Sequence, residues 1–116
     1  MKREFVEIEL FTRTWNALKL SDDELRDLQE FLLADPKAGD LIRGTGGARK
    51  VRIAFQGQGK SGAGRVIYVD YAISERIYLL LVYPKSKQVT LSETQKKAAR
   101  ELICAIQREE QKNGKK

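Results

Sequence analysis

The fold is decided by the longest apolar stretch of the chain, Ile77-Tyr78-Leu79-Leu80-Leu81-Val82-Tyr83. A run of this length, rich in branched and aromatic side chains, is typical of a strand that is covered on both faces. Residues 64–70 before it are also strand-like, and residues 71–76 are too few for the crossover that parallel strands require. We therefore predict that the two segments form an antiparallel hairpin at the centre of a sheet.

Two further strands are predicted upstream of this hairpin. Residues 4–11 and residues 48–54 each alternate between two faces, which is the period of a strand. Residues 39–47 are rich in turn-forming residues, and glycines at positions 57, 59, 62 and 64 indicate a loop between the second and third strands. The short spacings predict antiparallel neighbours throughout this part of the chain.

Helices are predicted where a capping box precedes apolar residues at helical spacing. Ser21-Asp22-Asp23-Glu24 begins one helix, which ends at Asp35-Pro36. Ser92-Glu93-Thr94-Gln95 begins the last helix, and the charged residues 108–116 are expected to fray at its end. Residues 12–20 form either a short helix or an irregular connection. The predicted order is therefore β-α-α-β-β-β-α, an α+β arrangement.

The length and composition limit the class of protein. We predict a single domain over residues 1–116, because the chain has the length of one domain and shows no repeat or linker. The longest apolar stretch is far below the roughly 20 residues of a membrane-spanning helix, so we expect a soluble, cytoplasmic protein. Cys104, the single cysteine, excludes an intramolecular disulfide and is predicted to be buried in the last helix.

Positive charge is concentrated in the middle of the chain. The net charge is +6, yet no acidic residue occurs in positions 41–69, which carry the basic residues Arg43, Arg49, Lys50, Arg52, Lys60 and Arg65. A polyanion is the natural partner of such a segment. A membrane surface is a weaker candidate, because these basic residues are interleaved with glycines and strand-forming residues and do not line an amphipathic helix.

The second predicted strand places Lys50 and Arg52 on one face, and Val51 and Ile53 on the other. Arg65 begins the adjacent strand, where a hairpin would bring it near Arg52. Three cations would then share one surface with no acidic residue nearby in the sequence. Such a surface is either a solvated face or a defined anion site, and the spacing alone leaves both open.

Several kinds of chemistry are disfavoured by the sequence. Gly57-Gln58-Gly59-Lys60-Ser61 is similar to a phosphate-binding loop, but Ala54 stands where that motif needs its first glycine, and a strand follows instead of a helix. We interpret the segment as a loop that places Lys60 against a polyanion. The absence of histidine excludes a Ser-His or Cys-His nucleophile, and no metal site is predicted. RNA cleavage without metal would depend on lysines as proton carriers and on arginines that hold phosphate.

Three segments together resemble toxins of the RelE/ParE superfamily, in particular the HigB-like branch of RelE. The segments are residues 39–52 with Gly44-Thr45-Gly46-Gly47, residues 59–68, and residues 78–83 followed by Lys85. The resemblance implies a small RelE-like α+β fold, in which a curved antiparallel sheet carries two N-terminal helices and a C-terminal helix. It also implies the toxin of a type II toxin-antitoxin system, with no cofactor.

The implied activity is a ribosome-dependent endoribonuclease that cuts translated mRNA in the 30S decoding site without a metal. Its implied partner is a cognate antitoxin of the DNA-binding helix-turn-helix type, through which alone operator DNA would be contacted, and no membrane partner is implied. The alternatives are a non-catalytic RNA-binding module and a ParE-like topoisomerase inhibitor. The retained basic residues argue against the inhibitor.

The family motif also implies roles for single residues. Lys50 or Arg52 would move or orient the 2′-OH proton, Arg65 would hold the scissile phosphate, and Lys85 would assist the leaving group. Candidate contacts to RNA or the ribosome are Arg43, Arg49, Lys60, Tyr83 and Lys87. Leu91 stands where some members carry a tyrosine that stacks on a base, which leaves Tyr83 as the candidate for stacking.

Overall fold

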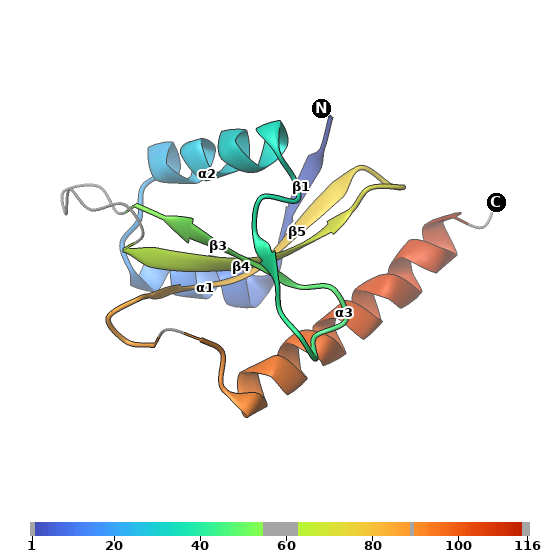
Figure 1. Ribbon diagram of the computed structural model, residues 1–116. Coiled ribbons are helices and arrows are strands. Elements are labelled where there is room, and N and C mark those ends of the chain that lie inside the picture. The colour runs from blue at the N-terminus through green and yellow to red at the C-terminus, as the bar shows by residue number, and fades with distance from the viewer. Residues whose placement is uncertain (1, 55–62, 89, 115–116) are drawn as a thin grey trace.

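Five strands form one sheet in the computed structural model, which describes residues 2–54, 63–88 and 90–114. In chain order the elements are β1 (Glu4–Glu7), α1 (Glu9–Ala17), α2 (Asp22–Ala34), β2 (Asp40–Leu41), β3 (Arg49–Ile53), β4 (Gly64–Tyr71), β5 (Arg76–Pro84) and α3 (Glu93–Gly114). The strands lie in the order β1-β5-β4-β3-β2 (Figure 1). The predicted α+β class is confirmed.

The predicted central hairpin is present as β4 and β5. The two strands are antiparallel, with Val66 opposite Val82 and Ile77 opposite Asp70. Residues 77–83 are all buried, as expected for a strand covered on both faces. The hairpin therefore forms the centre on which the remaining elements pack.

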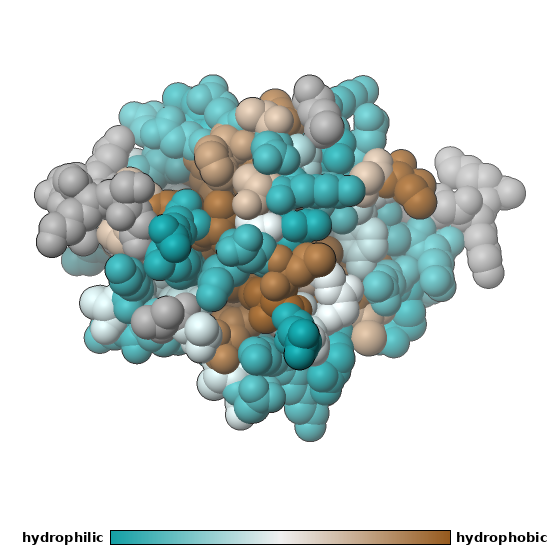
Figure 2. Space-filling model, in the orientation of Figure 1, coloured by the Kyte–Doolittle hydropathy of each residue, from teal (hydrophilic) through white to brown (hydrophobic). Residues whose placement is uncertain are grey.

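Helices cover both faces of this sheet (Figure 1). Side chains of α1 and α2 form one apolar layer with the sheet, among them Phe11, Trp15, Leu28 and Leu32. Ile103 and Ile106 of α3 belong to a second layer, which includes Ala48, Ile67 and Tyr83. In Figure 2, hydrophilic residues dominate the outer surface of α3, whereas apolar residues are visible between α3 and α2. A strand side chain thus packs against α1 and α2 on one face of the sheet, or against α3 on the other.

The N-terminal part differs from the prediction. β1 is parallel to β5, with Glu4 opposite Arg76, so the sheet is mixed and not wholly antiparallel. The strand ends at Glu7, and α1 begins at Glu9 inside the predicted strand. Phe11 and Trp15, four residues apart, are both buried in the core, because this spacing places them on one face of a helix. The short strand β2 was also not predicted.

Both capping boxes are confirmed. The Ser21 hydroxyl accepts a bond from the Glu24 amide, and the Glu24 side chain bonds back to the Ser21 amide. Ser92 and Gln95 exchange the equivalent bonds at the start of α3. No helix in the described part of the chain is long and apolar enough to cross a membrane.

The end of α3 is more ordered than predicted. The helix continues to Gly114, and Glu110 holds its last turns to β5 by bonds to Tyr78 and to Arg76, the latter at 3.1 Å. The prediction of a buried Cys104 is wrong, since the thiol is exposed. Ile103 and Ile106 occupy the buried positions of this part of the helix, which turns Cys104 to solvent.

Candidate nucleic-acid interface

One row of side chains crosses three strands at one end of the sheet. Arg52 in β3 lies opposite Arg65 in β4, and Arg65 lies opposite Tyr83 in β5. Residues directly opposite each other in antiparallel strands point to the same face. Tyr83 and Ile67 belong to the layer covered by α3, so the row lies on that face of the sheet. The hairpin thus pairs Arg52 with Arg65 as the sequence indicated.

Lys50 lies on the same face, two residues before Arg52 and opposite Ile67. Its side chain is half-buried, whereas that of Arg52 is exposed. The two cations are therefore held on a rigid strand at the spacing expected from the sequence. Because β2 pairs only with Arg49 and Lys50, Arg52 lies beyond the end of β2.

Arg65 is the most buried cation of the row, with 7% of its surface exposed. Its Nη1 donates to the Gly64 carbonyl at 3.0 Å, which fixes the guanidinium beside the backbone. The neighbouring Tyr83 is 5% exposed. Burial raises the pKa of the Tyr83 phenol, and the positive charge of Arg65 partly opposes this rise. The phenol therefore stays protonated at neutral pH, and its buried ring offers little face for stacking on a base.

The loop after β5 brings Lys85 to the same end of the sheet. The Lys85 amide donates to the Ala63 carbonyl at 2.9 Å, next to Gly64 and Arg65. The Lys87 amide donates to the Pro84 carbonyl at 3.0 Å and closes a tight turn. Both lysine side chains are exposed. The backbone thus places Lys85 close to the Arg65 end of the row, with Lys87 farther along the turn.

Arg49 is not brought together with this row. It lies on the opposite face of β3, like Val51, which packs against α1 and α2. Its Nη1 donates to the carbonyl of Gly39 at 2.7 Å and to that of Lys37 at 3.4 Å. These bonds hold the segment between α2 and β2. The family motif had suggested Arg49 only as a contact to RNA or the ribosome.

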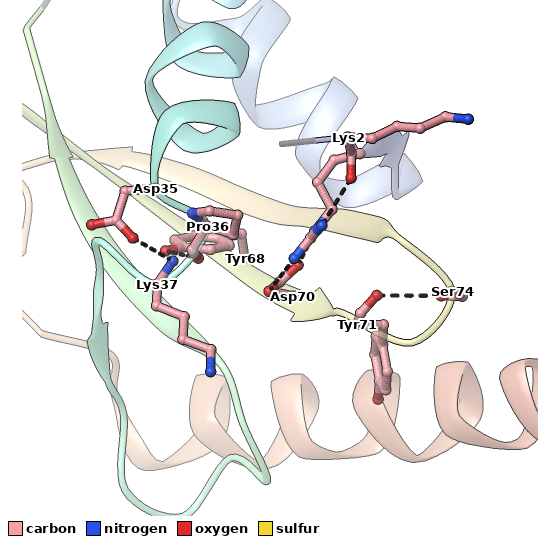
Figure 3. Close-up of polar contacts among 9 residues, drawn as sticks. Lys2, Asp35, Pro36, Lys37, Tyr68, Asp70, Tyr71 and Ser74 are labelled. Carbon is pink, nitrogen blue, oxygen red and sulfur yellow. Dashed lines mark hydrogen bonds and ion pairs between the residues drawn. The ribbon is translucent and has the colours of Figure 1, made fainter.

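The same segment is fixed by a buried tyrosine. Tyr68 is fully buried, and its hydroxyl donates to the Pro36 carbonyl at 2.8 Å, as Figure 3 shows. The Gly39 amide donates to the same hydroxyl at 2.9 Å. Burial raises the pKa of the Tyr68 phenol above its ordinary value. The hydroxyl therefore remains a donor, and the Asp35–Gly39 connection is held against β3 and β4.

Arg43 lies apart from the row, against the start of α3, and Lys60 lies outside the described residues. Within residues 2–54, 63–88 and 90–114 there is no group of three His, Cys, Asp or Glu side chains placed to hold a metal ion. The structure therefore unites four predicted residues at one end of the sheet: Lys50, Arg52, Arg65 and Lys85.

A cavity of about 270 Å³ lies beside Arg52, between α1, α2 and β3. It was not anticipated from the sequence, because its lining comes from three separate elements. Its walls are mainly apolar, with two carboxylates among the lining residues Trp15, Glu24, Asp27, Leu28, Phe31, Arg52, Ile53 and Ala54. Arg52 is thus a member of the cationic row and also borders a cavity with two acidic residues.

The fold and the basic row define a small α+β protein that carries a cluster of cations at one end of its sheet. A family model described as the RelE toxin of the RelE / RelB toxin-antitoxin system matches residues 5–114, and the chain belongs to this family. A free-state mutant structure of E. coli toxin RelE is similar in fold, with a TM-score of 0.53 and 15% identity. That match covers 76% of this chain and 88% of the other.

Proposed function

We propose that this chain is the toxin of a type II toxin-antitoxin system and acts as a ribosome-dependent endoribonuclease on translated mRNA. Membership of the RelE toxin family supports the role as a toxin. The observation that carries the proposed cleavage is the Lys50, Arg52 and Arg65 cluster on adjoining strands, with Lys85 held beside it by the Ala63 carbonyl. We propose further that the chain belongs to the HigB-like branch.

The chemistry follows from what these side chains are able to do. In metal-independent cleavage the 2′-oxygen attacks phosphorus, its proton is removed, and the bond to the 5′-oxygen breaks as that oxygen gains a proton. Arg65 is suited to hold the phosphate, because its guanidinium is already fixed beside the backbone and remains charged. It would stabilise the charge that develops on the phosphorane.

The proton-transfer roles belong to lysines in this proposal. An arginine is a poor base, because its guanidinium does not lose a proton in proteins. We therefore assign removal of the 2′-OH proton to Lys50, which is half-buried, and orientation of the attacking 2′-oxygen to Arg52. Lys85, on the turn beside Gly64, would protonate the 5′-oxygen. Tyr83, which is buried opposite Arg65, would pack beside Arg65 and would not stack on a base.

The partners in the proposal follow from the same role. The cationic row would receive mRNA in the 30S decoding site, and a cognate antitoxin would neutralise the toxin. We expect an antitoxin of the DNA-binding helix-turn-helix type that alone contacts operator DNA. The proposed location of this activity is the cytoplasm, with no membrane partner.

The test is mapping of RNA ends in a translating extract. Wild-type protein is expected to give cuts in phase with codons, and these cuts should disappear when ribosomes are omitted. Arg65→Ala should lose them, while Arg13→Ala, which removes an exposed arginine of α1, should keep them. Because Arg65 is buried, Lys50→Gln is a second variant with less risk to folding, and circular dichroism verifies the fold of each.

Two results would contradict the proposal. Cuts that persist in both Arg65→Ala and Lys50→Gln would show that the cationic row does not carry out the cleavage. Growth arrest by the wild type with intact mRNA and damaged DNA would instead indicate a topoisomerase inhibitor.

A further inference from the structure

Two glutamine side chains join the loop after β5 to the start of α3. Gln88 Nε2 donates to Gln95 Oε1 at 2.8 Å, and Gln95 Nε2 donates back to Gln88 Oε1 at 3.3 Å. We call these two residues the glutamine pair. Both side chains are half-buried. The cleavage chemistry proposed above uses neither of them.

Further bonds fix the orientation of both amide groups. Gln88 Nε2 also donates to the Thr90 carbonyl at 2.9 Å, so both of its N–H groups are used. Gln95 Oε1 also accepts from the Ser92 amide at 2.9 Å. Turning the Gln88 amide over would place its oxygen against the oxygens of Thr90 and Gln95. The glutamine pair is therefore a specific contact with one favourable arrangement.

The helix on one side of the glutamine pair is itself anchored to the sheet. Leu91, just before α3, and Ile103 within it are buried in the layer that contains Tyr83 of β5. Arg100 Nη1 donates to the Gly44 carbonyl at 3.1 Å, which joins the helix to the turn before β3. The start of α3 is thus a fixed support for the loop after β5.

The turn on the other side of the glutamine pair carries Lys85. The amides of Lys87 and Gln88 both donate to the Pro84 carbonyl, at 3.0 and 3.4 Å. Lys85 lies inside this turn, and its own amide donates to the Ala63 carbonyl at 2.9 Å. The backbone of Lys85 is therefore held on one side by the Ala63 carbonyl and on the other by the attachment of Gln88 to α3.

A lysine that acts as a general acid needs a backbone held in this way. Its ammonium group must come within about 2.6–3.2 Å of the oxygen that it protonates. The lysine stem is flexible, and the Lys85 side chain is exposed, so the position of its backbone is the main restraint on the ammonium group. A misplacement of about 1 Å can cost about 100-fold in rate.

We infer that Gln88 is a positioning residue for RNA cleavage, which fastens the Lys85 turn to α3 through Gln95. The Lys85 ammonium group is thereby placed to give its proton to the 5′-oxygen as the bond from phosphorus to that oxygen breaks. The inference rests on the proposed function and deepens it. A helix cap does not explain the contact, because Ser92 and Gln95 complete the cap between them and the bonds of Gln88 are additional.

The experiment measures the single-turnover rate of mRNA cleavage at saturating ribosome concentration. Gln88→Ala removes both bonds of the glutamine pair and leaves the cap of α3 in place. We expect it to slow cleavage by about 10-fold, because the Lys85 turn is then held on one side only. Circular dichroism verifies that the variant is folded.

Ser92→Ala is the matched control. It removes the hydroxyl that accepts from the Gln95 amide, but leaves both bonds of the glutamine pair. It should weaken the start of α3 and still cut at about the wild-type rate. An equal loss of rate in Ser92→Ala and Gln88→Ala would show that only the stability of α3 matters, and it would overturn the inference.

Gln95→Glu is the conservative variant. Its carboxylate would still accept from the Ser92 amide and from Gln88 Nε2, and only the 3.3 Å bond back to Gln88 would be lost. The variant should therefore keep most of the cleavage rate. A loss as large as that of Gln88→Ala would contradict the inference.

Two measurements show whether Gln88 acts through Lys85. In the Lys85→Ala background, Gln88→Ala should cause no further loss of rate, because the group that it positions is already gone. An RNA with sulfur in place of the scissile 5′-oxygen should be cut about as fast by Gln88→Ala as by the wild type, because a thiolate leaves without being protonated. Additive losses, or a defect that persists with the sulfur substrate, would overturn the inference.

The same assays separate this inference from the proposed function. If the wild type does not cut, the proposed enzyme is wrong, and the role of Gln88 falls with it. If the wild type cuts and Gln88→Ala cuts at the same rate, the positioning role alone is refuted and the proposed enzyme is unaffected.

Discussion

Replacement of Glu110 by glutamine should detach the end of α3 from the sheet in a way that depends on pH. The Glu110 side chain is 13% exposed and accepts bonds from the Tyr78 hydroxyl and from Arg76 Nη1. Glutamine keeps the shape and one acceptor oxygen but loses the charge. Because charge-assisted bonds are about twice as strong as neutral ones, we expect a loss of about 1–2 kcal/mol in the free energy of unfolding.

This loss converts into a measurable shift in melting temperature. Unfolding entropy of about 2.1 cal/mol/K per residue gives about 0.24 kcal/mol/K for a chain of this size. The Glu110→Gln variant should therefore melt about 4–8 °C below the wild type at about pH 7. The assay is thermal unfolding followed by circular dichroism. Glu109→Gln is the matched control, because Glu109 is the exposed neighbour on the same helix.

The sign of the pH dependence follows from the pKa of Glu110. Burial by itself would raise this pKa, but the bonds from Tyr78, Ser74 and Arg76 outweigh burial and lower it below its ordinary value of 4.5. A carboxyl whose pKa is lowered by folding contributes its full stability above the unfolded-state pKa and loses it as the pH falls through the folded-state pKa. The difference in melting temperature between the wild type and Glu110→Gln should therefore become smaller as the pH is lowered from about 7 to about 3.

Two results would refute this reasoning. An equal difference in melting temperature at both pH values would mean that the Glu110 charge does not stabilise the fold. An equal loss in Glu109→Gln would mean that any charge removed from this helix has the same effect, and that the contact with Tyr78 is not responsible.

Three further predictions concern the strands and the loop after β5. Gly39→Ala should lower the free energy of unfolding by about 1–3 kcal/mol in urea titrations, since its Cβ would lie 2.8 Å from the carbonyl oxygen of Lys50. Lys85→Ala should slow single-turnover cleavage by about 100-fold with little change in ribosome affinity, and Lys87→Ala should have a much smaller effect on the rate. Stability should fall as the pH rises from about 10 to about 12, because burial and the bond to Glu110 raise the pKa of Tyr78 to about 12 in the folded state. Calorimetry of Tyr78→Phe provides the check: its stability should fall less steeply over this range, since only the buried tyrosines that remain, such as Tyr68 and Tyr83, still contribute.

The features that the sequence predicted correctly are those determined within a few residues. Both capping boxes depend on side chains three positions apart, and both helices begin where these boxes stand. The central hairpin follows from two apolar strands that are too close together to be parallel. Local geometry decides each of these features, so no knowledge of the rest of the fold was needed.

The features that were missed depend on distant parts of the chain. β1 finds its partner in β5, some seventy residues away, and nothing in its own alternation indicates the direction of pairing. Residues 9–11 fit a strand and a helix equally well. The helix forms because it buries both Phe11 and Trp15 in the apolar layer on the sheet. Cys104 is flanked by apolar residues, yet a shift of one position around a helix turns a side chain by about 100° and exposes it.

Two adjacent residues of the candidate site also differ in a way that depends on strand geometry and not on charge. Arg49 and Lys50 are adjacent cations in the densest basic stretch of the chain, and charge alone cannot separate them. Alternation along β3 sends them to opposite faces, where Arg49 meets the carbonyls of Gly39 and Lys37 and Lys50 meets the row completed by Arg65. Because β3 is short, a slip of one residue in its pairing would exchange these two environments. The bonds of Arg49 to the Gly39 segment are therefore available only in the observed register, which is also the register that places Lys50 and Arg52 on the face of Arg65.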